Sequence, residues 1–140
     1  MKVIMLLADA AQVCDGKLYI LGGGWSVTGP DPVPSALAMK IEVPWDQGNM
    51  RHKFEARLYD ADGMPVMIET PQGTKPILVG GEFETGRPAG LKPGTPLDVP
   101  LAFGLGPLAL KPGSRYVWRL SIDGHHDENW QAAFSTRPRK

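Results

Sequence analysis

The sequence predicts an all-β protein, a single domain over residues 1–140 that folds as an antiparallel two-sheet β-sandwich. We expect an immunoglobulin-like arrangement of eight or nine short strands. Apolar and polar residues alternate with a period of two in segment after segment, which is typical of strands with one buried face. The 17 glycines and 14 prolines are scattered and divide the chain into short pieces, and no piece keeps a helical period for three turns. An up-and-down barrel is the alternative, which the dense prolines disfavour only mildly.

The first predicted hairpin turns at Asp15-Gly16, where glycine can supply a positive φ. Its second strand continues as "KLYILGGGW". We interpret Gly22, Gly23 and Gly24 as a bend or bulge after Leu21, with the strand resuming at Trp25, because glycine tolerates such backbone angles and a close approach of the sheet.

Five later segments show the alternation most clearly, and we predict a half-buried strand in each: residues 35–43, 52–59, 97–105, 115–122 and 129–134. Asp62-Gly63 should form a second hairpin turn, and Asp123-Gly124 should open a longer loop that returns Trp130 against the strand of Trp118. Pro100 indicates an edge strand or a bulge. Residues 28–36 and 86–96 are the two longer loops.

The balance of charge limits the classes of partner. Lysine plus arginine equals aspartate plus glutamate at 15 each, so the formal net charge is zero. A nucleic-acid partner is not expected, because phosphate binding normally requires an excess of basic residues. Self-association would meet little long-range repulsion.

A single cysteine, Cys14, excludes an intramolecular disulfide and fits a reducing cytoplasm. The apolar run at residues 3–8 ends at Asp9, which is short for a signal peptide. No segment reaches the length of a membrane span, so we expect no membrane partner. Cys14 has no neighbouring basic residue that would lower its pKa, and we expect no catalytic role for it.

The three glycines do not form a phosphate-binding loop. A dinucleotide site needs G-x-G-x-x-G followed by a helix, whereas the next glycine here, Gly29, comes too late and "PDPVP" follows it. The final Gly-Lys-Ser/Thr of a Walker loop is also absent.

Two groups of residues have the chemistry of metal ligands. His125 and His126 stand next to Asp127 and Glu128, with His52 elsewhere in the chain, but adjacent histidines in an extended loop point in opposite directions. We interpret them as a solvated hairpin tip. Six aspartates could bind calcium at one end of a sandwich, although the EF-hand spacing is broken at Gly63. They are Asp9, Asp15, Asp60, Asp62, Asp123 and Asp127. We favour plain turns, and expect no cofactor and no metal.

Four tryptophans fall into two classes. Trp118 and Trp130 are in register with apolar strand positions, so we expect them in the core. Trp25 and Trp45 border loops and are open to a role in contact with another molecule, such as stacking on a sugar.

Three stretches carry a resemblance to a known family: "LLADAAQVCDGKLYILGGGW" from residue 6, "DADGMPV" from residue 60 and "LAFGLGPLALKPGSRYVWRLSIDG" from residue 101. Together they resemble a family of small uncharacterised bacterial proteins, a domain of unknown function. The closing segment is also similar to the last hairpin of many bacterial immunoglobulin-like domains. The resemblance implies a fold over nearly the whole chain but no activity, ligand or catalytic residue.

The sequence therefore predicts a non-enzymatic protein of the bacterial cytoplasm that acts by contact with itself or another protein. Sheet edges offer unpaired backbone groups for such contacts. We expect the interaction surface at Gly22, Gly23, Gly24, Trp25 and Trp45. The alternative function is a small-ligand module that binds a carbohydrate or calcium, and an enzyme with a site assembled from distant residues is a third hypothesis.

Overall fold

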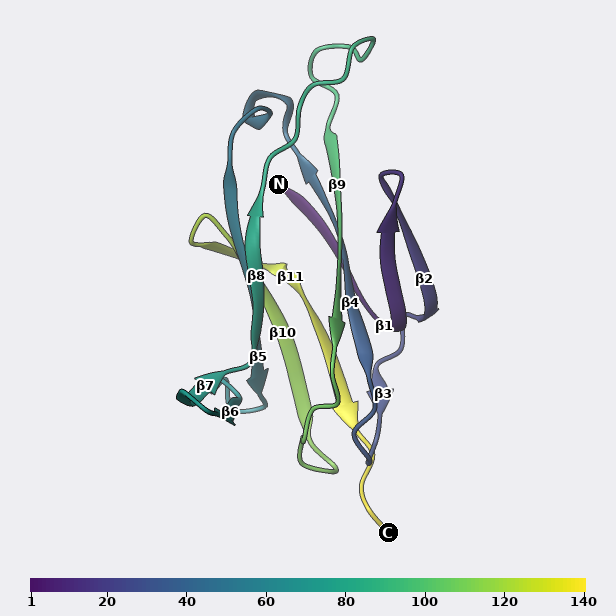
Figure 1. The fold of residues 1–140 in the computed structure, drawn as a ribbon, viewed down its shortest axis with the longest axis vertical. Helices are drawn as coiled ribbons and strands as arrows, with labels where there is room; N and C mark the ends of the chain where they lie inside the picture. Colours follow the sequence, from purple (N-terminus) through teal and green to yellow (C-terminus); the bar gives the residue numbers. More distant parts are fainter.

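The computed structural model describes all residues 1–140 and confirms the all-β prediction (Figure 1). Eleven strands and one short 3-10 turn, η1 (Trp45–Gln47), form the protein, with no α-helix. The strands are β1 (Lys2–Cys14), β2 (Lys17–Gly23), β3 (Val27–Thr28), β4 (Ser35–Val43), β5 (His52–Asp60), β6 (Met67–Thr70), β7 (Gly73–Pro76), β8 (Leu78–Phe83), β9 (Leu97–Leu105), β10 (Arg115–Ile122) and β11 (His125–Thr136). The chain forms no helix that is long and apolar enough to cross a membrane.

Nine of the strands form two sheets that face each other. One sheet has the order β2-β1-β4-β9, and the other has the order β3-β11-β10-β5-β8. All pairs within them are antiparallel except β3 with β11, which is parallel. The short hairpin β6-β7 stands apart at one end of the second sheet.

The core lies between these two sheets and follows the predicted alternation. In β4 and β10 alternate side chains face this core and are buried, for example Leu37, Met39 and Ile41 in the first and Trp118 and Leu120 in the second. Nineteen buried residues from both sheets form one continuous cluster. Because each strand places alternate side chains on opposite faces, a period of two in the sequence gives each sheet one apolar face.

Several details differ from the sequence-based expectations. Asp123-Gly124 does not open a long loop: it is the two-residue turn itself, with Ile122 paired to His125. The extra residues form a bulge farther along β11, where the register with β10 shifts between Arg119 and Ser121. The strand does not resume at Trp25 but at Val27, and it does so in the other sheet.

Other details agree with the expectations. Asp15-Gly16 is the turn between β1 and β2, and Trp118 and Trp130 are buried. Pro100 lies in β9, an edge strand, opposite Lys40. Proline fits this position because an edge strand needs no N–H on its outer side.

Candidate interaction surface

The hairpin β1-β2 forms an arm, here defined as Asp9–Gly23, whose side chains are partly or fully exposed. Its turn has Asp15 at φ 52° and Gly16 at φ 71°, the pair of positive angles that a two-residue type I′ hairpin requires. Leu18 and Ile20 are half-buried on one face of β2, whereas Tyr19 and Leu21 on the other face are 49% and 72% exposed. The arm therefore presents apolar side chains to solvent.

The arm bends back over the outer face of the first sheet. Both β1 and β2 contact β9, although β4 lies between β1 and β9 in the sheet. Ala8, Ala36 and Ala38 belong to the outer face, yet at most 2% of each is exposed. In Figure 1 the arm reverses the direction of the first half of β1. Its half-buried face therefore covers the small alanine side chains and leaves the opposite face free.

The outer edge of β2 has no partner strand. In a two-residue hairpin the residues that flank the turn, Cys14 and Lys17, form a hydrogen-bonded pair, and bonded pairs recur at every second residue. Tyr19 and Leu21 therefore direct their backbone groups toward β1. The backbone N–H and C=O groups of Leu18 and Ile20 point away from the sheet and are free to pair with another strand.

Four other stretches of sheet edge are open. β9 contains Pro100 and β8 contains the Gly80-Gly81 pair. β3 covers only the last two residues of β11, and the rest of that edge is bulged and carries Asp127 and Glu128. The first half of β1 pairs with β4 alone. Prolines, bulges and charged residues protect an edge against strand addition, and glycines weaken a strand. The edge of β2 carries one charged residue, Lys17, at its start.

The three glycines mark the point where the chain leaves the arm and crosses to the second sheet. Gly22 has φ 58° and Gly24 has φ 86°, in the left-handed region that favours glycine. A Cβ on Gly22 would also run into the carboxylate of Asp9. Gly22, Gly23 and Gly24 thus have structural reasons to be glycine, and they line an open depression beside Asp9 and Arg137.

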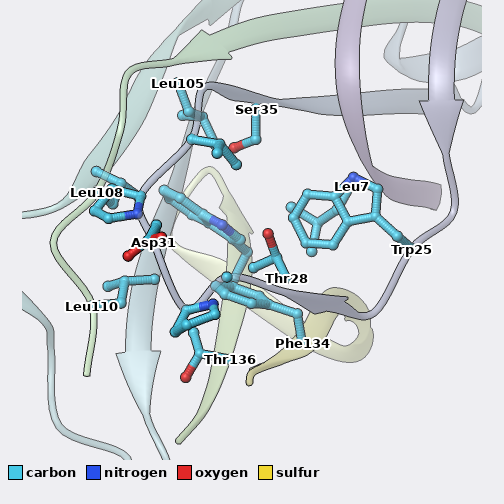
Figure 2. A pocket seen from close by; sticks show the side chains of 15 residues that line it. Leu7, Trp25, Thr28, Asp31, Ser35, Leu105, Leu108, Leu110, Phe134 and Thr136 are labelled. Atoms are coloured by element: carbon cyan, nitrogen blue, oxygen red, sulfur yellow. The ribbon is translucent and has the colours of Figure 1, made fainter. Parts of the chain in front are cut away.

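Trp25 lies at this crossing and closes one end of the core. Its ring packs edge-on against Phe134, with 6.0 Å between the ring centroids, and borders a cavity of about 40 Å³ (Figure 2). The indole Nε1 atom is buried without a hydrogen-bond partner. Pockets for drug-sized ligands usually exceed about 300 Å³, so this cavity is too small for a sugar.

Trp45 is not brought together with the glycines and Trp25. Trp25 and Ser35, the first residue of β4, line the same cavity, whereas Trp45 lies two residues beyond the last residue of β4. Nine extended residues separate the two ends by about 26 Å. The guanidinium of Arg87 lies 5.4 Å from the centroid of the Trp45 ring and covers one face of it. The expected surface is therefore two separate regions.

The candidate metal ligands are dispersed. No group of three or more histidine, cysteine, aspartate or glutamate side chains lies close enough together to hold a metal ion. Asp15 is in the turn of the arm, Asp60 is the last residue of β5 with Asp62 just beyond it, and Asp123 is in the turn between β10 and β11. His125 and His126 are exposed at the start of β11, directly after the two-residue turn, and His126 bonds through Nδ1 to the carbonyl of Leu120. Cys14 is exposed at the arm's tip.

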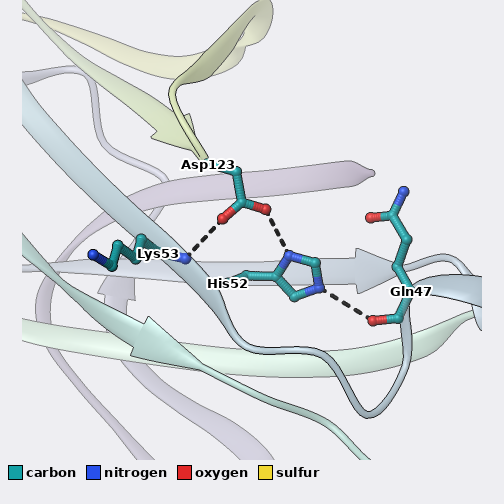
Figure 3. A network of polar contacts seen from close by, with 4 residues as sticks. All are labelled: Gln47, His52, Lys53 and Asp123. Carbon is teal, nitrogen blue, oxygen red and sulfur yellow. Dashed lines mark hydrogen bonds and ion pairs between the residues drawn. The ribbon is translucent and has the colours of Figure 1, made fainter.

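His52 and Asp123 form a polar centre that sequence reasoning did not identify (Figure 3). The buried imidazole bonds through Nδ1 to the Asp123 carboxylate at 2.7 Å and through Nε2 to the backbone oxygen of Gln47 at 3.1 Å. Asp123 also accepts a hydrogen bond from the Lys53 N–H. Burial opposes the charged imidazole, but the bonds to Asp123 and Gln47 outweigh it and raise the pKa of His52, while the same pair lowers the pKa of Asp123. Both ring nitrogens form hydrogen bonds within the protein, and the bond to Asp123 connects β5 to the turn between β10 and β11.

Comparison with known protein families places the chain in one of them. Residues 3–132 match the profile of a family of unknown function, DUF6941. The chain belongs to this family. The match covers nearly the whole length of the chain, including the arm and both sheets except the end of β11. The chain matches none of the curated proteins and none of the solved structures with which it was compared.

The sequence contained a signal for the arm that was not recognised. "KLYIL" has apolar residues on both faces of a strand, with no polar face for solvent. Such a strand is expected either between two layers or at a contact with another molecule. By contrast, no local pattern could have paired His52 with Asp123, because 71 residues separate them.

Proposed function

We propose that this DUF6941 protein is a non-enzymatic interaction module that binds another polypeptide at the edge of β2. The observation that carries the proposal is the unprotected outer edge of β2, flanked by the exposed side chains of Tyr19 and Leu21. An extended segment of a partner can add to such an edge through backbone hydrogen bonds, while side-chain contacts select the partner. The zero net charge removes long-range repulsion as an obstacle.

The proposal includes an immunoglobulin-like sandwich as the scaffold. The order β1-β4-β9 opposite β11-β10-β5-β8 corresponds to strands A-B-E opposite G-F-C-C′ of that architecture. In this correspondence the arm is an insertion after strand A. The fold itself does not decide the function, since sandwiches carry many activities. We also propose a bacterial cytoplasmic location, which the single, exposed Cys14 fits.

Photo-cross-linking inside the producing cell tests the proposal. A photoreactive residue at Leu21, 72% exposed, should give protein adducts, whereas one at Met64, 61% exposed and distant from the arm, should give few. Adding Ile20→Pro, which removes an outward N–H from the edge, should abolish the adducts at Leu21. Equal cross-linking at both positions, or adducts that persist with proline, would refute the proposal.

A carbohydrate is the second candidate partner, and the region around Trp45 favours it. Trp45 borders an open depression of about 560 Å³ together with Lys2, Glu42 and Asp46, which supply one aromatic face and polar groups. Arg87 would have to leave the ring before a sugar could stack on that face. Titration with a glycan panel should then shift the tryptophan emission of the native protein but not of Trp45→Phe. A flat response in both would exclude this candidate.

A further inference from the structure

Resting on the proposed function, we infer that the polypeptide bound at the β2 edge is a second copy of this chain, paired antiparallel through β2 itself. The argument depends on which backbone groups are free. The backbone N–H and C=O groups of Leu18 and Ile20 point outward from the sheet. The left-handed φ of Gly22 ends the extended segment just beyond these two residues. A symmetric partner must therefore use these same two residues.

Only one antiparallel register uses both residues on each copy. It places Leu18 opposite the Ile20 position of the second copy, and Ile20 opposite its Leu18 position. The twofold axis then passes beside Tyr19, which faces its own counterpart as a non-hydrogen-bonded pair. Such an interface is isologous, because the same patch serves both copies.

The side chains suit this register. Tyr19 would meet Tyr19 of the second copy on the exposed face, and aromatic cross-strand pairs stabilise sheets. Leu21 would lie opposite Lys17, whose aliphatic stem can cover it while the ammonium group stays in water. The two lysines lie at opposite ends of the paired segment, so no like charges face each other. The self-pairing would cover the two most exposed apolar side chains of the arm.

Disulfide trapping distinguishes pairing in the proposed register from random collision between exposed cysteines. In a Cys14→Ser background, Tyr19→Cys should oxidise to a covalent dimer, because the Cα atoms of a non-hydrogen-bonded pair lie about 4.5 Å apart, within disulfide range. Leu21→Cys should not, because its counterpart would be four residues away along the strand, about 13 Å. Leu21 is the more exposed position, so random collision would give the opposite order. Faster trapping at Leu21→Cys, or none at Tyr19→Cys, would overturn the inference.

Light scattering on the purified chain provides a second, independent measurement. The native protein should approach twice its 15.2 kDa mass as its concentration rises from micromolar to millimolar. Ile20→Pro should remain at the mass of one chain, whereas Ile20→Ala, which keeps the N–H, should still dimerise. A native protein that stays monomeric over this range would overturn self-pairing. The photo-cross-linking result separates the two proposals. Adducts at Leu21 whose mass differs from twice the chain mass would support binding of another polypeptide at the β2 edge and would refute self-pairing.

Discussion

The His52–Asp123 pair predicts a specific dependence of stability on pH. His52 has a raised pKa, so its contribution is complete below its ordinary value of about 6.5 and is lost as the pH rises through the folded value. Asp123 has a lowered pKa, so its contribution is complete above its ordinary value of about 3.9 and is lost as the pH falls through the folded value. The pair therefore stabilises the protein most between about pH 4 and pH 6.5.

Asp123→Asn is the informative substitution. Asparagine tolerates the positive φ of 52° at this position and can still accept a hydrogen bond, so the change removes mainly the charge. Burial of His52 is then no longer offset by a carboxylate, and its pKa should fall below the ordinary value. The variant should lose stability as the pH drops below about 6.5, in the range where the native pair is complete.

The magnitude follows from the contacts. A hydrogen bond that involves a charged group contributes about 1.5–3 kcal/mol, and the lower half of that range applies because the Asp123 side chain is 45% exposed. For Asp123→Asn we expect the free energy of unfolding to fall by about 2 kcal/mol near pH 5 and by less than about 1 kcal/mol near pH 9, where His52 is neutral. At about 2–4 °C per kcal/mol, the melting temperature near pH 5 should fall by roughly 4–8 °C.

Urea unfolding followed by tryptophan fluorescence measures this difference, since buried Trp118 and Trp130 report on the core. Asp127→Asn is the matched control, because the Asp127 carboxylate accepts only the nearby Asn129 N–H. A decrease in the free energy of unfolding of Asp123→Asn that is equal near pH 5 and near pH 9, or larger near pH 9, would refute the reasoning.

Four further substitutions have defined outcomes, all measured by thermal or urea unfolding. Gly22→Ala should lower the free energy of unfolding by about 1–2 kcal/mol because of the left-handed backbone at this position, and by a further amount because the new Cβ meets Asp9. Gly24→Ala should show only the backbone effect, because nothing lies within 4 Å of its Cβ position. Equal losses would contradict the contact. Trp118→Ala should cost about 3–5 kcal/mol, because the side chain is 1% exposed at the centre of the core. A loss below about 1 kcal/mol would contradict that placement. Thr136→Val should cost about 1–3 kcal/mol, since the buried hydroxyl donates to the Lys111 carbonyl at 2.6 Å and accepts from the Ser114 N–H at 3.0 Å. An unchanged midpoint would show that neither bond contributes.

The sequence was sufficient to predict the strands that line the core. Alternation in β4, β5 and β10 is a local property, because each residue's face depends only on its position in the strand. The turn at Asp15-Gly16 was predictable for the same reason, since both φ angles are set by the residues themselves. Pro100 on an edge strand follows from its missing N–H.

Features that depend on distant residues were not predictable. The bulge in β11 was read as a loop, because the residues between Ser121 and Trp130 do not reveal how they pair with β10. Trp25 and Trp45 both border loops in the sequence, but their separation depends on which end of β4 each of them joins. The pairing of His52 with Asp123 depends on β5 and β10 being neighbours in the sheet.

Amide hydrogen exchange at the edge of β2 tests the central claim most directly. The N–H groups of Tyr19 and Leu21 point toward β1 and should be protected at every protein concentration. Those of Leu18 and Ile20 should exchange rapidly in dilute solution and become protected as the concentration rises and the edges pair. Leu18 and Ile20 amides that remain unprotected at millimolar concentration, while Tyr19 stays protected, would contradict the pairing of this edge with a second copy.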